Sequence, residues 1–220
     1  MKYRTCVSIG EKNPKKVKSI LKKALSKSDY AEIRFDFLKK ADIPAVLEDI
    51  KKNLPRCVCT LRPKSEGGYF VGKEDERKSI LRLIAEYNPY LLDVEFNTIQ
   101  KDKKLATYLK KSKSKLLISW HDFKKTPNES QLRTKFNKMK KFSDVVKIVT
   151  VAKSVSDASR LLSLYSVKSK SKTIAFCMGE QGKFSRILCL HLGSPFTYVS
   201  LGKAIAPGQF SVDEIKSLEN

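Results

Sequence analysis

A lysine interrupts an apolar stretch in the second half of the chain. Lys147 stands in VVKIVTVA at residues 145–152, with valine and isoleucine around it. Burial and neighbouring cations both lower the pKa of a lysine, and the neutral amine is the form that attacks a carbonyl carbon. The alternative is a lysine at a strand edge, with its ammonium reaching water along a flexible stem. The apolar surroundings favour Lys147 as a nucleophile.

A histidine stands at the end of another apolar segment. The chain has 2 histidines, and His121 lies near the end of KLLISWHDF at residues 115–123. Neutral imidazole accepts and donates protons near pH 7, so His121 is a candidate for proton transfer. His191 lies in the helical stretch RILCLHLG, and we interpret it as a packing or surface residue.

Charged side chains also occur in and after the earlier apolar segments. Glu32, Arg34 and Asp36 alternate in EIRFDF, a spacing that predicts three side chains on one face of a strand. A solvent-facing edge is the simple alternative, but charges on a covered face are usually paired or functional. Arg62 ends the next segment, and Glu66 follows in the loop PKSEGG, where two glycines permit a tight turn.

Two further pairs of polar residues follow. Asp93 and Glu95 alternate in LLDVEF, where an ion-pair network and a binding site are both possible. Arg186 follows a strand-like segment in MGEQGKFSR, close to a predicted helix start, and Gln209 follows Pro-Gly in APGQFS. A guanidinium and an amide together suit a ligand with a carboxylate and hydroxyls.

The elements that must position these residues alternate regularly. Eight β-rich segments cover residues 3–9, 30–37, 56–62, 91–96, 115–123, 145–152, 173–178 and 196–201. Helical patterns occupy residues 17–25, 45–53, 76–87, 131–142, 157–165, 184–192 and 211–218. This order predicts an α/β fold, specifically a (β/α)8 TIM barrel with its chemistry at the carboxyl ends of the strands. A doubly wound open sheet is the alternative, because alternation alone does not prove closure.

The composition indicates a single globular domain over residues 1–220, since no linker or shift in composition divides the chain. Lysine and arginine number 45 against 23 acidic residues, so a nucleic-acid binder must be considered at a net charge of +22. The lysines recur in short groups along the whole length, which favours a solvated surface instead. No apolar run is long enough for a membrane span, and the 5 cysteines favour buried, reduced thiols. We therefore expect a cytoplasmic protein that binds neither nucleic acid nor membrane.

Six motifs carry a more specific signal. EIRFDF, CTLRPKSEGG, ISWHDFKKTP, VVKIVTVA, MGEQGKFSR and APGQFS occur in this order, and together they resemble the type I dehydroquinase pattern across nearly the whole chain. The resemblance implies a barrel lyase that dehydrates 3-dehydroquinate to 3-dehydroshikimate in the shikimate route to aromatic amino acids. It also implies that neither a metal nor an organic cofactor is used. The sequence alone does not give the oligomeric state, but dimers are common in this family, so a homodimer is expected.

The resemblance also assigns roles to individual residues. It makes Lys147 the imine-forming nucleophile, His121 the proton-transfer residue and Glu66 the partner that positions and tunes the histidine. It places Glu32, Arg34 and Arg62 at ring hydroxyls, and Arg186 and Gln209 at the substrate carboxylate. One position departs from the pattern, because Ile205 stands where many relatives have serine.

Two other function classes were weighed against this one. Another Schiff-base barrel enzyme, such as a class I aldolase, would keep the strand lysine but gives no reason for the EGG and APGQ loops together. A basic nucleic-acid-binding domain leaves the charges inside the strands unexplained and predicts binding that weakens steeply with salt.

Overall fold

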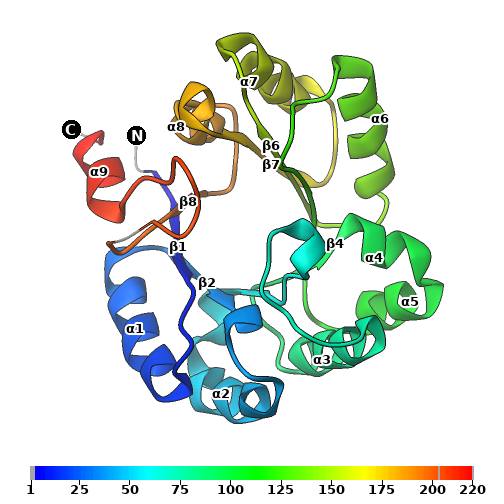
Figure 1. The fold of residues 1–220 in the computed structure, drawn as a ribbon, viewed down its shortest axis with the longest axis vertical. Helices are drawn as coiled ribbons and strands as arrows, with labels where there is room; N and C mark the ends of the chain where they lie inside the picture. The colour runs from blue at the N-terminus through cyan, green and yellow to red at the C-terminus, as the bar shows by residue number, and fades with distance from the viewer. Residues whose placement is uncertain (1–2, 203, 220) are drawn as a thin grey trace. The chain divides into compact units, whose positions relative to one another are not determined.

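The computed structural model describes residues 3–202 and 204–219, and the strands of this part form one eight-stranded sheet in the order β7-β6-β5-β4-β3-β2-β1-β8 (Figure 1). The strands are β1 Thr5–Ile9, β2 Tyr30–Arg34, β3 Cys57–Thr60, β4 Leu91–Glu95, β5 Leu116–Asp122, β6 Val145–Val151, β7 Lys172–Met178 and β8 Thr197–Val199. The helices are α1 Pro14–Lys27, α2 Ile43–Ile50, α3 Glu74–Glu86, α4 Phe96–Lys101, α5 Lys103–Lys111, α6 Glu129–Met139, α7 Val155–Leu162, α8 Ser185–His191 and α9 Val212–Ser217. Each predicted strand overlaps an observed one.

Residues Val7–Leu117 form one compact unit. Its strands β2, β3 and β4 are parallel, with Arg34 opposite Thr60 and Thr60 opposite Asp93. The carboxyl ends of these three strands are thus in register, which places their last polar residues side by side. Helix α1 packs against α2 and against β2. Helices α4 and α5 were not predicted.

Helix α3 positions an arginine inside this unit. The side chain of Glu76 caps the helix by accepting from the backbone N of Lys73 at 2.8 Å. Its buried residues are Arg77, Leu81, Ile84 and Ala85, a spacing that defines one face of a helix. Arg77 therefore occupies a core-facing position, where an apolar residue is the usual choice.

The other compact unit comprises the described residues up to Cys6 and those from Ile118 onward. Strands β6 and β7 are parallel along their whole length, from Val145 opposite Lys172 to Val151 opposite Met178. Helices α7 and α8 pack against β7. Six of the seven residues of β6 are buried, and Lys147 is one of them, opposite Ile174.

The prediction that Asp36 shares a strand face with Glu32 and Arg34 is wrong. Strand β2 ends at Arg34, and Phe35–Phe37 form a 3-10 turn closed by a hydrogen bond from Leu38 N to Phe35 O at 3.0 Å. The turn carries Asp36 back toward Arg34. Strand β3 also ends earlier than predicted, at Thr60, so Arg62 lies two residues beyond it.

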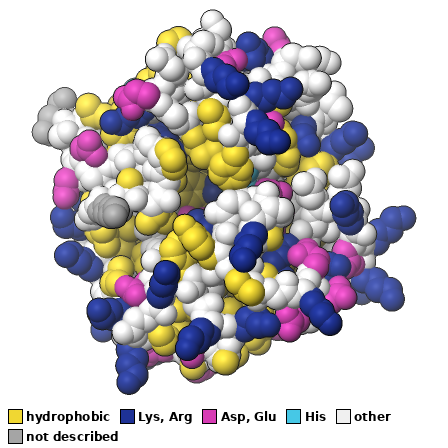
Figure 2. Space-filling view, viewed as in Figure 1, with side chains coloured by type: hydrophobic (Ala, Val, Ile, Leu, Met, Phe, Trp, Pro, Cys, Tyr) yellow, Lys and Arg dark blue, Asp and Glu magenta, His cyan; other side chains and the backbone are white. Residues whose placement is uncertain are grey.

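All five cysteines are buried and carry free thiols, as predicted. In the described part of the chain, no helix has both the length and the apolar character needed to cross a bilayer. Lysine and arginine side chains are spread over the face seen in Figure 2, with acidic side chains among them. The assignment of residues 1–220 to a single catalytic domain stays a prediction.

Candidate active site

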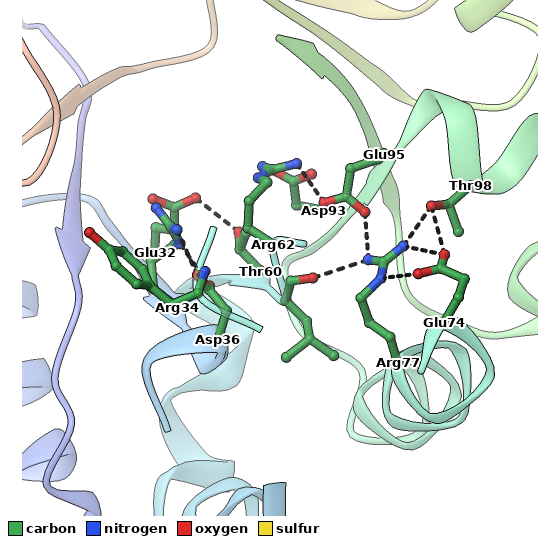
Figure 3. A network of polar contacts seen from close by, with 12 residues as sticks. Glu32, Arg34, Asp36, Thr60, Arg62, Glu74, Arg77, Asp93, Glu95 and Thr98 are labelled. Atoms are coloured by element: carbon green, nitrogen blue, oxygen red, sulfur yellow. Dashed lines mark hydrogen bonds and ion pairs between the residues drawn. The ribbon is translucent and has the colours of Figure 1, made fainter. Parts of the chain in front are cut away.

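Polar side chains gather where β2 and β3 end (Figure 3). Glu32 is buried and accepts a hydrogen bond from Thr60 Oγ1 at 2.9 Å. Arg34 binds Asp36 through two parallel contacts, Nε to Oδ1 at 2.8 Å and Nη2 to Oδ2 at 2.7 Å. This two-point geometry fixes the plane of the Arg34 guanidinium. Of the predicted site residues, Glu32 and Arg34 thus lie on one strand, Glu32 bound to Thr60 and Arg34 bound to Asp36.

Arg62 is held by the two carboxylates of β4. Its Nη2 lies 2.5 Å from Asp93 Oδ2 and its Nη1 lies 2.7 Å from Glu95 Oε1. All three side chains are at most 4% exposed. Burial lowers the pKa of Arg62, but the charges of Asp93 and Glu95 outweigh burial and hold that pKa above its usual range. Of the two interpretations offered for Asp93 and Glu95, the structure contains the ion-pair network.

Glu66 ends a short 3-10 turn, Lys64–Glu66, and is buried. The turn closes through Gly67, which adopts a φ of 75° that glycine tolerates best. A Cβ on Gly68 would lie only 2.0 Å from the carbonyl oxygen of Arg62. The two glycines therefore allow the Glu66 loop to fold directly onto the Arg62 backbone. The same loop is fixed to the strand end, since Tyr69 N donates to Asp36 Oδ2 at 3.0 Å.

Lys147 lies in the other unit, on β6. It is 5% exposed, and its Nζ lies 4.1 Å from the centroid of the Tyr198 ring. Tyr198, on β8, is itself buried and packs against Phe176 of β7 with ring centroids 6.2 Å apart. The prediction of an apolar, water-poor setting for this lysine is confirmed. An ammonium above an aromatic face also has a favourable electrostatic contact.

Arg186 lies on α8 in the same unit and is 2% exposed. Its Cζ lies 4.4 Å from the centroid of Phe176, and its Nη2 donates to Pro207 O at 3.0 Å. Its Nε is buried without a hydrogen-bond partner, and no carboxylate of the described residues forms an ion pair with it. Burial lowers the pKa of this guanidinium to about 10, so it remains cationic at neutral pH. An unpaired buried cation of this kind is suited to an anionic ligand.

Gln209 follows the Pro-Gly turn that contacts Arg186. It is buried, and its Oε1 accepts from the backbone N of Ile205 at 3.1 Å. Pro207 of the same turn accepts from Arg186, and a Cβ on Gly208 would lie 3.9 Å from Arg186 Nε. The structure therefore brings Arg186 and the turn that carries Gln209 together. Ile205, the position at which the sequence departs from the motif pattern, is 37% exposed.

His121 belongs to the same unit as Lys147, near the end of β5, and is partly buried. Its ring stacks on Phe123 at a centroid distance of 5.9 Å. His191 is exposed and lies 2.8 Å from the hydroxyl of Tyr3, in line with the surface role predicted for it. Within the described residues no group of three or more histidine, cysteine or acidic side chains is arranged to hold a metal ion.

Three residues around the predicted set were missed. Phe176 and Tyr198 lie in ordinary β-rich segments, which give no sign that their rings contact cations. Arg77 carried a usable signal, because it falls in register with the apolar positions of its helix.

A family model described as type I 3-dehydroquinase matches residues 5–219. The 3-dehydroquinate dehydratase of Methanocaldococcus jannaschii is 35% identical over 218 residues, covering 97% of this chain and 96% of that protein.

Solved structures are similar as well. Type I 3-dehydroquinate dehydratase from Clostridium difficile matches with a TM-score of 0.88 at 25% identity, covering 98% of this chain and 90% of the other. The 3-dehydroquinate dehydratase from Aquifex aeolicus matches with a TM-score of 0.82 at 28% identity, covering 98% and 97%. These similarities confirm the predicted fold class, a (β/α)8 barrel.

Proposed function

We propose, since this chain belongs to the type I 3-dehydroquinase family, that it removes water from 3-dehydroquinate to give 3-dehydroshikimate through an imine on Lys147. Membership confirms the predicted enzyme class, a carbon–oxygen hydro-lyase. The proposal adds the covalent mechanism, the residues that carry it and a place in the shikimate route.

The observation that carries the mechanism is the setting of Lys147. Lys147 is 5% exposed on β6, whose other buried residues are three valines, Ile148 and Thr150. Burying a basic side chain at such a position costs free energy, which points to a role for it. The centroid of the Tyr198 ring lies 4.1 Å from Lys147 Nζ, so the amine has an aromatic face on one side. Such an amine is suited to attack the ketone of the substrate, with loss of water, and form an iminium ion.

The iminium withdraws electrons and acidifies the neighbouring C–H bond of the substrate. His121 takes that proton, and the electron pair moves into the ring to form an enamine. The enamine then expels the β-hydroxyl, which leaves as water after protonation by His121. Hydrolysis of the remaining imine releases the product and restores Lys147. Acid–base assistance of this kind contributes about 10²- to 10⁴-fold in rate.

The substrate carboxylate is assigned to Arg186 and Gln209. Arg186 has a buried Nε without a partner, and the turn that carries Gln209 contacts it through Pro207. A bound carboxylate would satisfy that nitrogen and neutralise the charge. Glu32, Arg34 and Arg62 are assigned to the ring hydroxyls, and Glu66 to the positioning of His121. The homodimer and the cytoplasmic location remain predictions.

The test is to incubate the protein with 3-dehydroquinate and borohydride, which reduces an imine to a stable amine, and to map the adduct by mass spectrometry. With borohydride we expect one adduct, on Lys147. Without borohydride we expect turnover to 3-dehydroshikimate. Lys147→Met should lose both. Lys153→Met is the matched control, since Lys153 is exposed just after the same strand.

Two results would overturn the proposal. An adduct on a different lysine would reject the assignment of Lys147. Trapping of a ketone on Lys147 without dehydration of 3-dehydroquinate would favour another Schiff-base barrel enzyme, such as a class I aldolase.

A further inference from the structure

A second buried arginine, Arg77, lies across Glu95 from Arg62 and belongs to no motif of the predicted site (Figure 3). Arg77 is fully buried on α3, although arginine is rarely fully buried unless it is paired. Its Nη1 lies 2.6 Å from Glu95 Oε2. The other oxygen of the same carboxylate lies 2.7 Å from Arg62 Nη1. Glu95 is therefore shared, with one oxygen for each arginine.

Arg77 also contacts the backbone next to Arg62. Its Nη1 donates to the carbonyl oxygen of Leu61 at 3.1 Å. Arg77 is thus connected to Arg62 in two ways. It binds the Leu61 carbonyl, which precedes Arg62 in the chain, and it binds Glu95, which orients the Arg62 guanidinium. On its outer side, Arg77 binds Glu74 through Nε at 2.9 Å and Nη2 at 2.8 Å. Thr98 Oγ1 accepts from Arg77 Nη2 at 2.5 Å.

We propose that Arg77 is a positioning residue for the reaction, which holds Glu95 ionised and oriented so that Arg62 presents its guanidinium to the hydroxyls of the substrate ring. The proposal rests on the proposed function, in which Arg62 binds those hydroxyls. Arg77 itself touches no reacting atom.

The charges of the cluster support this role. Glu95 is faced by Arg62 from the segment after β3, by Arg77 from α3 and by Asp93 from its own strand. With both arginines present, the buried carboxylates Asp93 and Glu95 have two guanidinium groups between them, and the half-exposed Glu74 binds the outer side of Arg77. Without Arg77, Asp93 and Glu95 would share one guanidinium in a buried setting, which favours protonation of one carboxylate. Burial already raises the pKa of Glu95, and Arg77 opposes that rise.

The alternative is that Arg77 only fastens α3 to the sheet. The positioning role and the fastening role can be distinguished by experiment, because Arg77 has contacts both toward Arg62 and away from it. Glu74 holds the outer side, and its side chain is 48% exposed and contacts neither Glu95 nor Arg62. A fastening role predicts that Glu74→Gln and Arg77→Met weaken the protein alike, without a change in substrate binding.

The experiment measures kcat, KM, the pH profile of kcat/KM and the melting temperature for the wild type and for three variants. Arg77→Met should raise KM by about tenfold to a hundredfold with a smaller fall in kcat, since a misplaced contact costs up to about 10²-fold. The acid limb of the kcat/KM profile of Arg77→Met should move to higher pH, because Glu95 with a raised pKa stays protonated until higher pH. Arg77→Lys keeps the charge, so its acid limb should stay near that of the wild type while its KM is intermediate. Glu74→Gln should keep KM within about twofold.

The outcomes are separable. If Arg77→Met melts at a lower temperature with an unchanged KM and acid limb, the positioning role is rejected and the fastening role stands. If Arg77→Met does not fold, the Arg77→Lys variant tests the positioning role. A KM equal to that of the wild type in this variant would show that the guanidinium of Arg77 is not needed to position Arg62, and would reject the proposal. A wild type that neither dehydrates 3-dehydroquinate nor forms the trapped adduct overturns the proposed function, and this proposal with it.

Discussion

Replacing Arg186 with methionine should make the empty protein more stable while disabling it as an enzyme. Burial lowers the pKa of Arg186 from the ordinary arginine value to about 10, a shift of between two and three units. At about 1.4 kcal/mol for each pKa unit, the charged form is disfavoured by roughly 3 kcal/mol. At pH 7 the arginine is charged in both the folded and the unfolded chain, so the whole penalty applies. It is relieved only as the pH rises above about 10, where the folded chain has released a proton that the unfolded chain still binds.

The contacts that methionine would lose offset part of this gain. The cation–π contact with Phe176 contributes about 1 to 2 kcal/mol. The carbonyl of Pro207 lies on an exposed residue, where water can replace the lost donor. The net gain is about 1 to 2 kcal/mol, which for a chain of this length raises the melting temperature by roughly 2 to 8 °C.

Binding should change in the opposite direction. Removing one partner of a buried charge pair costs about 2 to 5 kcal/mol, a loss of roughly 30-fold to several thousand-fold in kcat/KM. Calorimetry without ligand and steady-state kinetics with 3-dehydroquinate measure the two effects on the same samples. Arg160→Met is the control, because Arg160 in the same unit is paired with Asp157 at 2.9 Å and should give neither effect. A ligand-free Arg186→Met that melts below the wild type would refute the reasoning.

Two further predictions concern single residues of the site. His121→Ala should still form the borohydride-trapped imine on Lys147 while losing most turnover, and unchanged turnover would remove His121 from proton transfer. Ile205→Ser should lower KM by no more than about fivefold, since a hydroxyl at this exposed position adds one hydrogen bond of about 1 kcal/mol, and a KM that rises would show that the isoleucine itself is needed.

The sequence was informative where one side chain contrasts with its local surroundings. The burial of Lys147 could be predicted because the residues on both sides of it are apolar and β-branched, as expected for a strand that is covered on both faces. The cysteines were placed correctly for the same reason. Asp36 was misplaced because the residues of EIRFDF are compatible both with a continuous strand and with a strand that ends in a 3-10 turn. The contacts of Asp36 with Arg34 and with Tyr69 N accompany the turn, and the second of these comes from a distant segment.

Interactions between segments that are distant in the chain could not be predicted in this way. Glu95 could be read as part of a site or of an ion-pair network, and only the arrival of Arg62 and Arg77 from two other segments decides between them. Helices α4 and α5 escaped because they are short and follow one another with Asp102 between them, where it caps α5 by accepting from Leu105 N. A lone periodic pattern does not reveal such a break.

The pair of aromatic rings between Lys147 and Arg186 also has a consequence for selectivity among metabolites. Tyr198 and Phe176 each lie against one basic side chain and pack against each other, so one aromatic pair lies between the Lys147 amine and the Arg186 guanidinium. A neutral ketone could reach the amine, but it would leave the buried Nε of Arg186 without a partner and so gain little from binding. A keto acid of the right length would satisfy both ends at once. The unsatisfied Nε of Arg186 thus favours substrates that carry a carboxylate, and common cellular aldehydes and simple ketones should be poor competitors for Lys147.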